Sequence, residues 1–445
     1  MGASVIVVGG GLAGLTAAYT LQKRGFAVEV LEQETTPGGR MRSEAHGGFI
    51  VERGAQFIAS SYRNMHALAR ELGIAHRISP LRNSRNAVLK NGRFVAAEYE
   101  GLKAIGRSRD LSWPSKLRLL KLLWHVWRQR RFLDFYRPEE AASLDGESAS
   151  EYTRRELGQE VLDYLVDPAF ASTFTVLPEN LSKAFLLVTI ATMLRGFRLQ
   201  AFGGGNGLLT QTLAARVTVR LGAQVTCVES GWDGVTVRLR DGEPRRADAV
   251  VVAVPGNAVG GLCAGITASE SAFFEAVRYA ASIIVFVMTS GLEADPGVYG
   301  VGIPRREGVS LYGLAVENPK EGVVPAGKTM FNCAFSEAAA AGLFGASDEV
   351  VVEAVHRELA KLPLRGLDRV EGHAVHRWPA LVPQFYPGYH RALARFLTRD
   401  DRSDRLFFAG DYLVGPYTEA ALTSGLRAAE EAAVRLGVPS REVSF

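Results

Sequence analysis

The feature that most limits the fold of this chain is a set of glycines close to its N-terminus. A short β-branched run, 5–8, is followed by three glycines in the spacing G-x-G-x-x-G and then by apolar residues of helical composition. In this context Gly9 permits a tight turn, Gly11 lets the backbone approach a pyrophosphate, and Gly14 lets the helix pack closely on the strand. The pattern predicts a βαβ unit in which free N–H groups at the helix N-terminus meet a diphosphate.

A carboxylate follows these glycines at the distance typical of a dinucleotide site. Glu32 ends a second predicted strand, 28–32, about 20 residues beyond the glycine pattern. There its oxygens can accept hydrogen bonds from both ribose hydroxyls, and its charge repels a 2′-phosphate, which disfavours NADP. The alternative is a solvated residue at a strand end, but the spacing favours the dinucleotide interpretation.

Composition excludes several classes of protein. Of the 445 residues, 47% are hydrophobic and 22% are charged, as in ordinary globular chains, and the net charge of +4 is too small to indicate nucleic-acid binding. The three cysteines lie far apart and the eight histidines form no ligand pattern, so we expect neither a disulfide framework nor a metal site. No apolar stretch reaches about 20 residues. These features predict a cytoplasmic protein and leave its oligomeric state open.

The chain changes character along its length, which predicts two discontinuous domains. Segments of the βαβ type occur at the start, in the middle and at the end, and a mostly helical region at 100–200 interrupts them. We expect one domain to bind the dinucleotide and the other, which contains the helical region, to bind substrate. The predicted boundaries are 1–95, 205–265 and 395–445 for the first domain, and 96–204 and 266–394 for the second.

Glu32 is followed by Gly38, Gly39 and Arg40, and this order carries a specific resemblance. A glycine pattern with a downstream Gly-Gly-Arg resembles the FAD-binding signature of the superfamily of flavin-containing amine oxidases, protoporphyrinogen oxidases and carotenoid (phytoene) desaturases. The resemblance implies that the segment lies along the pyrophosphate and the flavin. Glycines there allow close backbone approach, and a guanidinium suits a phosphate or a flavin carbonyl. In isolation, Gly-Gly-Arg would indicate only a surface turn.

Three further segments, 49–57, 248–255 and 408–425, resemble motifs of the same superfamily. They imply a Gly-Ala pair beneath the flavin ring, backbone contacts to adenine just before the middle strand, and an acid at the ribityl or phosphate part. A helix N-terminus that points at the flavin carbonyls follows. The residues so implicated are Gly54, Ala55, Val225, Gly410, Asp411 and Ala420. The implied fold is α/β: a Rossmann-like FAD-binding domain of the two-dinucleotide-binding-domain type with an inserted α+β substrate domain.

The resemblance also implies how the cofactor is held and what it does. The monoamine oxidase branch attaches FAD through a cysteine in the C-terminal part, and this chain has no cysteine beyond Cys333. We therefore expect FAD to be bound non-covalently. Enzymes of this kind pass a hydride from the substrate to the flavin N5, with dioxygen or another oxidant as the expected electron acceptor.

Looser resemblances indicate the class of substrate. Segments 168–182, 202–208 and 378–385 resemble parts of protoporphyrinogen oxidases. Segment 282–287 resembles the strand that carries an active-site lysine in amine oxidases, and it has no lysine. We expect an FAD-dependent oxidoreductase that takes hydride from a bulky, largely apolar or conjugated substrate, either porphyrinogen-like or polyene/isoprenoid. The alternatives are a flavin amine oxidase that lacks the usual lysine and, more remotely, a non-catalytic lipid escort protein of the same fold.

Tyr417, Trp378 and Gln384 are the candidate catalytic residues. The superfamily places an aromatic residue near the flavin face, and an aromatic pair would form a slot that orients a flat substrate. The competing interpretation is that Trp378 and Tyr417 are core aromatics. His376 and Glu419 are candidates for a general base, although a lone histidine is more often structural and Glu419 can instead cap the last helix.

The stretch 116–131 combines basic and apolar residues in a helical pattern. One stripe of such a helix holds Leu117, Leu120, Leu123, Trp124 and Trp127. Basic charge together with tryptophan suits a helix that lies on a membrane surface. The alternative, which we favour, is a helix packed on the substrate domain with a solvated basic face.

Overall fold

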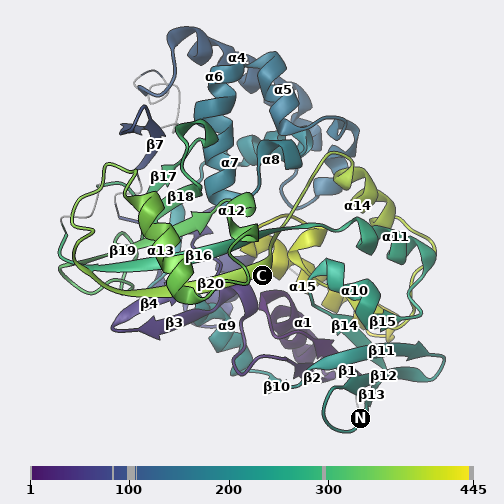
Figure 1. The fold of residues 1–445 in the computed structure, drawn as a ribbon. Coiled ribbons are helices and arrows are strands. Elements are labelled where there is room, and N and C mark those ends of the chain that lie inside the picture. The colour runs from purple at the N-terminus through teal and green to yellow at the C-terminus, as the bar shows by residue number, and fades with distance from the viewer. Residues whose placement is uncertain (1–2, 83–84, 98–105, 107, 293–296, 440–445) are drawn as a thin grey trace.

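The computed structural model describes residues 3–82, 85–97, 106, 108–292 and 297–439. Two large sheets and a group of helices beyond one of them make up the fold (Figure 1). Part of the region predicted to be helical, namely 100–105 and 107, lies outside the described residues.

The first elements form the βαβ unit that the glycine pattern predicts. They are β1 (Ser4–Val8), α1 (Leu12–Lys23) and β2 (Ala27–Leu31). β1 and β2 pair in parallel. Beyond the end of α1, Gly25 has a φ of 89°, a conformation that suits glycine and terminates the helix.

A five-stranded parallel sheet joins distant parts of the chain in the order β10-β2-β1-β14-β21. The added strands are β10 (Thr218–Arg220), β14 (Ala249–Val252) and β21 (Leu406–Phe408). Along β1, Val5 and Val7 pack on the side of α1, whereas Ile6 and Val8 pack into the core on the other face. A sheet buried on both faces explains the continuous β-branched runs, and the predicted Rossmann-like α/β fold is confirmed.

The last helix, α15 (Thr418–Arg435), packs against α1. A side chain at Gly425 would overlap the carbonyl oxygen of Ala13, so the close approach of the two helices requires glycine there. This contact fixes the C-terminal segment beside the N-terminal glycines.

A four-stranded sheet follows the order β13-β12-β11-β15. Its strands are β11 (Val225–Gly231), β12 (Gly234–Leu239), β13 (Arg245–Ala247) and β15 (Cys263–Ala264). β12 and β13 are antiparallel, and Gly242 in their connection has a φ of 106°, a conformation that suits glycine in a turn between antiparallel strands.

The largest sheet has seven strands in the order β20-β16-β19-β18-β17-β7-β8. They are β7 (Asn86–Lys90), β8 (Arg93–Ala96), β16 (Tyr279–Ser290), β17 (Gly300–Gly302), β18 (Leu311–Val316), β19 (Lys328–Phe335) and β20 (Val370–Pro383). β7 and almost all of β8 precede the predicted boundary at 95, yet they extend this sheet. The division into two domains stays a prediction.

Helices gather at the top of Figure 1, beyond the seven-stranded sheet. They are α4 (Trp113–Gln129), α5 (Ala149–Glu156), α6 (Gln159–Val161), α7 (Asp167–Phe174) and α8 (Lys183–Leu194). α5 begins with a capping box in which Ser148 and Glu151 bond each other's backbone N–H groups. α8 is apolar on nearly all sides and lies buried among the others.

The remaining elements connect or cover the sheets. The short strands are β3 (Ser43–His46), β4 (Phe49–Glu52), β5 (Ile58–Ala59), β6 (Ile78–Pro80) and β9 (Leu199–Phe202). The helices are α2 (Arg63–Glu71), α9 (Gly207–Ala214), α10 (Gly256–Leu262), α11 (Ala268–Ala276), α12 (Glu337–Ala341), α13 (Asp348–Leu359) and α14 (Tyr389–Leu397).

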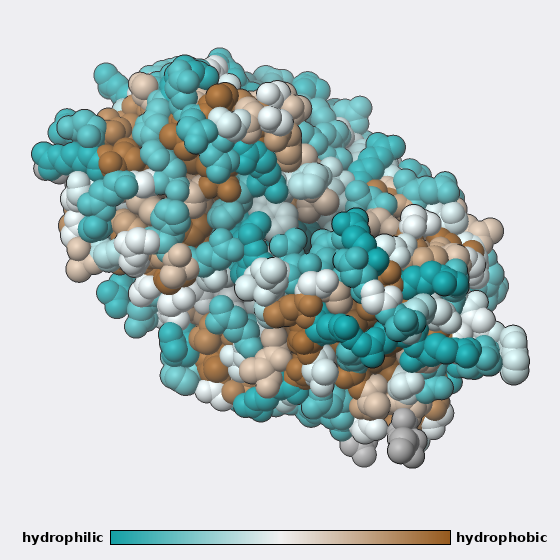
Figure 2. Space-filling view, turned by 60° about the horizontal axis from the view of Figure 1, so that its bottom comes forward, coloured by the Kyte–Doolittle hydropathy of each residue, from teal (hydrophilic) through white to brown (hydrophobic). Residues whose placement is uncertain are grey.

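Hydrophobic side chains are divided among separate patches on the face shown in Figure 2, and hydrophilic side chains cover most of that face. Among the described helices, none is both long enough and apolar enough to cross a bilayer.

Candidate active site

The N-terminal glycines form a turn that has no room for side chains at Gly9 and Gly14 and is open at Gly11. A Cβ at Gly9, whose φ is 108°, would lie 2.6 Å from the carbonyl oxygen of Ala253, and one at Gly14 would overlap the carbonyl oxygen of Gly9. A Cβ at Gly11 would meet nothing within 4 Å. The backbone at Gly11, directly before α1, therefore borders open space, as the approach of a pyrophosphate requires.

The predicted Gly-Gly-Arg segment lies against this turn. The N–H of Gly38 donates to the carbonyl oxygen of Gly10 at 2.8 Å, and a Cβ at Gly39 would stand 3.3 Å from the Cα of Gly11. Gly38 and Gly39 both have positive φ values, 115° and 54°. Two backbone segments that lack side chains thus face each other at the N-terminus of α1.

Glu32 is buried at the end of β2, beside the glycine turn. Its Oε2 accepts the N–H of Gly10 at 2.6 Å, and its Oε1 accepts the N–H of Glu34 at 2.9 Å. These bonds hold the carboxylate in one orientation while each oxygen keeps a lone pair for a ribose hydroxyl. The carbonyl oxygen of Glu32 accepts the N–H of Ala223 at 2.8 Å, which places Val225, at the start of β11, close to the same end of the site.

Arg40 and Asp411 meet across the chain in a bidentate ion pair. Arg40 Nη1 donates to Asp411 Oδ2 at 2.7 Å and Nη2 donates to Oδ1 at 3.0 Å, while Nη1 also reaches the carbonyl oxygen of Leu381 at 2.8 Å. Gly410 positions the acid, because its N–H donates to Ser424 Oγ of α15 at 2.9 Å. Burial opposes the charged guanidinium, but the carboxylate of Asp411 outweighs this and raises the pKa of Arg40.

Tyr279 completes this contact, and no sequence pattern indicated it. The guanidinium carbon of Arg40 lies 5.6 Å from the centroid of the Tyr279 ring. The Tyr279 hydroxyl lies 3.5 Å from Asp411 Oδ1 and accepts the N–H of Gly256 at 3.1 Å. Three distant parts of the chain, at Tyr279, Leu381 and Asp411, thus converge on one guanidinium.

The Gly-Ala pair is tied to Arg40 through the backbone. Ala55 donates its N–H to the carbonyl oxygen of Arg40 at 2.8 Å, and a Cβ at Gly54 would lie 2.6 Å from that oxygen. Asn206 Nδ2 donates to the carbonyl oxygen of Ala55 at 3.0 Å. Asn206 is another residue that the sequence did not single out, although it stands within the glycine-rich run 203–207.

At the opposite end of the site, α15 begins with buried groups. Ala420 is fully buried in the first turn, and Thr418 Oγ1 is buried without a hydrogen-bond partner among the described residues. The N–H of Ala420 already donates to the carbonyl oxygen of Tyr417 at 3.1 Å, so the helix dipole and the unpaired Thr418 hydroxyl are the features suited to a flavin carbonyl. The open glycine turn, the oriented carboxylate and this helix end together fit FAD, which would extend from Glu32 to the N-terminus of α15.

The three candidate catalytic residues occupy separate places in the structure. The Tyr417 ring stacks on Phe135 at 4.3 Å with an interplanar angle of 12°, and its hydroxyl donates to the carbonyl oxygen of Phe135 at 2.8 Å. Trp378 donates its indole N–H to the carbonyl oxygen of Arg53 at 2.6 Å. Gln384 is buried just after β20. The structure records no ring contact between Trp378 and Tyr417 within its described part, and the catalytic roles stay proposals.

Glu419 caps α2 rather than the helix in which it lies. Its Oε1 accepts the N–H of Asn64 at 2.7 Å, its Oε2 accepts the N–H of Met65 at 2.9 Å, and Tyr136 donates its hydroxyl to Oε1 at 2.7 Å. The alternative to a general base, that Glu419 caps the last helix, is therefore wrong, because the side chain reaches across to the N-terminus of a neighbour. Burial raises the pKa of Glu419 to about 7.

His376, the other candidate base, is buried on β20 with no hydrogen-bond partner for Nε2 among the described residues. Burial, and then the charge of Arg53, lower the pKa of His376 to about 4. The imidazole is therefore neutral near pH 7. The described residues contain no cluster of side chains suited to a metal ion.

A second buried polar cluster borders the Gly-Ala segment. Lys320 forms an ion pair with Glu317, and both side chains are fully buried. Lys320 Nζ also donates to Gln56 Oε1 at 3.3 Å, next to Ala55. Glu52 lies nearby and accepts the N–H of Asn206 at 2.7 Å. The sequence did not indicate this cluster, because its members come from three segments, 52–56, 206 and 317–320, that lie more than 100 residues apart and follow no spacing rule.

Burial dominates the titration of Glu52 and raises its pKa from 4.5 to about 7, although Lys320 and the hydroxyl of Ser43 lower it. Between pH 4.5 and about 7 the Glu52 carboxyl therefore keeps its proton in the folded state and loses it in the unfolded chain. Its contribution to the free energy of unfolding is complete below pH 4.5 and is lost as the pH rises through 7. We expect Glu52→Gln to flatten the pH dependence of stability by up to ~1 kcal/mol per pH unit in this window. Urea unfolding from about pH 5 to about pH 8 measures the effect.

Glu353→Gln is the matched control for this prediction, because the Glu353 side chain is 71% exposed on α13. The control is expected to follow the unmodified chain at every pH. An equally steep pH dependence in Glu52→Gln and in the unmodified chain would contradict the assignment.

Comparison with known proteins agrees with this geometry. The sequence model of the family described as flavin containing amine oxidoreductase matches residues 12–433. The chain belongs to this family. Its membership confirms a flavoprotein oxidoreductase with FAD as cofactor, as the sequence predicted.

Individual relatives include two porphyrinogen oxidases. Protoporphyrinogen oxidase 2 of Arabidopsis thaliana is 32% identical over 182 residues, which are 41% of this chain and 34% of the plant enzyme. The match thus spans about a third of that enzyme's length. Coproporphyrinogen III oxidase of Bacillus subtilis is 21% identical over 431 residues, covering 87% of this chain and 89% of the bacterial enzyme.

Among solved structures, cyclohexylamine oxidase of Brevibacterium oxydans superposes with a TM-score of 0.78 at 19% identity and covers 98% of this chain and 100% of its own. This similarity confirms the predicted α/β fold over almost the whole length.

Proposed function

We propose that this FAD enzyme oxidises a bulky, largely apolar or conjugated substrate, and that the substrate is porphyrinogen-like. The observation that carries the proposal is the similarity to coproporphyrinogen III oxidase along 87% of the chain, which includes the region of the helices and the seven-stranded sheet. The similarity to the plant protoporphyrinogen oxidase supports the same class of substrate. A polyene or isoprenoid substrate is the second candidate within this proposal.

When bound, FAD supplies a two-electron acceptor. The residues of the chain bind and orient the substrate and exclude water from the site. Arg40, held by Asp411, places a fixed positive charge beside the cofactor site. Phe135 and Tyr417 form a stacked aromatic layer at the N-terminus of α15, where they would exclude water and orient a flat substrate.

Tyr417 acts in this proposal through its ring and not as an acid or base. Its hydroxyl already donates to Phe135, and burial raises its pKa well above the ordinary value. Trp378, within β20, and Gln384, just after the end of β20 that approaches Arg40, are proposed to border the substrate. Dioxygen or another oxidant is the proposed final electron acceptor.

An amine substrate is the alternative. The fold is shared with cyclohexylamine oxidase, but residues 282–287 within β16 contain no lysine, and all six are fully or almost fully buried in the seven-stranded sheet. A lipid escort role is disfavoured, because all the parts of the proposed cofactor site, namely the glycine turn, Glu32, Arg40 and Asp411, are present.

Anaerobic mixing of the flavin-loaded enzyme with a panel of porphyrinogens, polyenes and amines tests the proposal. We expect a porphyrinogen to bleach the flavin band near ~450 nm faster than any amine or polyene. Bleaching by amines alone would show that the substrate class is wrong while leaving the flavin site intact.

Tyr417→Ala is expected to slow flavin reduction about ten-fold, because loss of a stacked aromatic contact costs ~1.4 kcal/mol of positioning. Tyr417→Phe keeps the ring and is expected to reduce the flavin at nearly the original rate. Single-turnover rates measured anaerobically provide the test. An equal loss in both variants would show that the hydroxyl, and not the ring, is the important group.

A further inference from the structure

α4 presents an exposed apolar stripe on the side opposite its packing face. Its inward face is made by Ser115, Leu119, Leu122 and Val126, which are all buried. The outward residues, here named the α4 stripe, are Trp113, Leu117, Leu120, Trp124 and Trp127, with exposed fractions of 68%, 63%, 51%, 48% and 61%. Their spacing of four and three residues in alternation places them along one side of the helix. No described element covers these side chains.

Cations accompany every tryptophan of the α4 stripe. The Lys116 ammonium lies 4.8 Å from the Trp113 ring, the Arg128 guanidinium 5.2 Å from Trp124, and the Arg130 guanidinium 4.9 Å from Trp127. Residues 113–132 contain six lysines and arginines and no acidic residue. Long basic side chains that flank exposed tryptophans are typical of a helix lying at a membrane surface.

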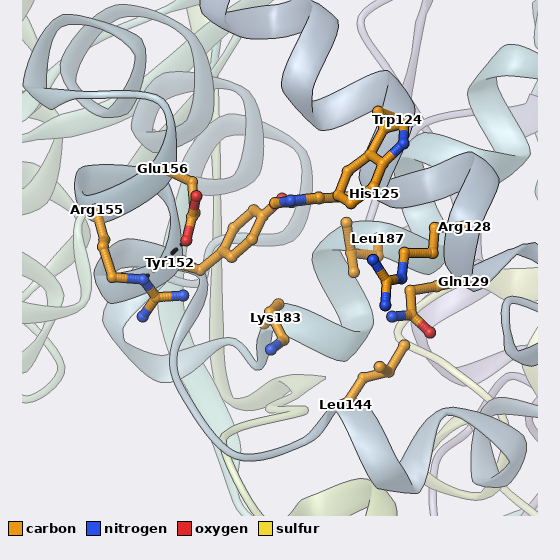
Figure 3. Close-up of a pocket in the computed structure, with 10 residues that line it drawn as sticks. All are labelled: Trp124, His125, Arg128, Gln129, Leu144, Tyr152, Arg155, Glu156, Lys183 and Leu187. Atoms are coloured by element: carbon orange, nitrogen blue, oxygen red, sulfur yellow. Dashed lines mark hydrogen bonds and ion pairs between the residues drawn. The ribbon is translucent and has the colours of Figure 1, made fainter.

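A cavity of about 270 Å³ opens beside the α4 stripe, between α4, α5 and α8 (Figure 3). Arg128 and Gln129 line it from α4, Arg155 from α5 and Lys183 from α8. Arg155 and Lys183 both pair with Glu147, and Arg155 also pairs with Glu156, which lines the cavity. Within the described part of the chain, Arg128 has only its contact with the Trp124 ring and no carboxylate partner. The cavity thus offers a cation that is available to an anion.

We propose that the α4 stripe docks on an anionic phospholipid bilayer and that the adjoining cavity holds the phosphate of one lipid against Arg128. The volume is near the lower end for small-molecule sites and suits a phosphate with its glycerol. Leu144 and Leu187 supply apolar wall for the glycerol and the upper acyl carbons. The proposal adds a partner to the enzyme and does not depend on which substrate it oxidises.

Charge decides between lipid and a second copy of this chain. Two α4 segments facing each other would bring together twelve basic side chains with no acidic residue between them, an arrangement that opposes association. An anionic surface instead attracts each basic side chain by about 1 kcal/mol, which strengthens binding to the surface about five-fold. Tryptophan rings are well suited to the boundary between headgroups and acyl chains.

Flotation with vesicles tests the proposal on the flavin-loaded enzyme. We expect the protein to float with vesicles of phosphatidylcholine and phosphatidylglycerol, less so at high salt, and weakly with phosphatidylcholine alone. The α4 stripe holds three of the five tryptophans, so the emission maximum is expected to shift to the blue on binding. This readout is independent of activity.

Four variants assign the effect to residues. Trp124→Ser combined with Trp127→Ser is expected to weaken vesicle binding at least about ten-fold, and Arg128→Gln about five-fold. The matched controls are Trp232→Ser and Arg93→Gln, which are expected to bind vesicles as the unmodified protein does. Trp232 is 91% exposed between β11 and β12, and Arg93 is an exposed residue of β8. All five sites are at the surface, so folding should be retained.

Several results would overturn the proposal. Absence of flotation would contradict binding to a bilayer. Equal flotation of Arg128→Gln and the unmodified protein would contradict the phosphate site. A dimer that dissociates on changing Trp124 and Trp127 would show that a second copy covers the α4 stripe. Inorganic phosphate added without vesicles could quench Trp124 emission as strongly as lipid does. That result would identify a soluble phosphate as the ligand of the cavity.

Discussion

Gly14→Val is expected to give a protein without flavin. A side chain at this position would overlap the carbonyl oxygen of Gly9 and press on Ala253, so α1 would have to move away from β1. Overpacking of this kind costs about 3 kcal/mol, which corresponds to a loss of at least about a hundred-fold in FAD affinity when the displaced helix end is the binding site. FAD titration followed by flavin absorbance measures the loss.

Two further variants separate this effect from a general folding defect. Gly260→Ala in α10 is the matched control, since a Cβ there meets nothing within 4 Å, and it is expected to bind FAD normally. Glu32→Gln keeps the shape of the side chain but removes its charge and one of the two oxygens that accept the N–H groups of Gly10 and Glu34, and we expect about ten-fold weaker FAD binding. Normal FAD affinity in Gly14→Val would contradict the placement of the pyrophosphate.

Lys320→Met is expected to lower the free energy of unfolding by about 3–5 kcal/mol. The Lys320 and Glu317 side chains are both fully buried, so removal of the lysine leaves a carboxylate without its counter-ion. Lys320 also holds Gln56 beside the Gly-Ala pair, and its loss removes that contact. Urea unfolding with and without added FAD gives the measurement.

The double variant Lys320→Met with Glu317→Leu is the control for this prediction. Replacing a whole buried ion pair by apolar residues is often nearly neutral, because no unpaired charge remains. We therefore expect the double variant to recover more than half of the stability that Lys320→Met loses. A double variant less stable than Lys320→Met would show that the pair contributes through shape and not through charge.

Local patterns predicted the cofactor half of the fold. The β-branched run of β1, the glycines and Glu32 lie within about 30 residues of each other, so their spacing alone indicates a βαβ unit and its ligand. Strands β14 and β21 were recognisable as apolar runs of the same kind. Each of these features depends on neighbours in sequence, which is why the sequence shows them.

Contacts between distant segments could not be predicted in the same way. Tyr279 reaches Asp411, and Lys320 reaches Gln56, across more than 100 residues in each case, and no periodicity records such pairings. Glu419 illustrates the same limit, because its position suggested a cap for its own helix and the fold gives it another. On α4, periodicity indicated an apolar stripe, but only the structure shows that Leu119, Leu122 and Val126 make the packing face.

Binding of FAD by the purified chain is the most direct test of the account. Titration with FAD, followed by absorbance near ~450 nm, is expected to show one tightly bound flavin per chain that acid precipitation releases intact. A well-folded, colourless protein that takes up no FAD would contradict the central claim that Glu32, the glycine turn and the start of α15 form one cofactor site.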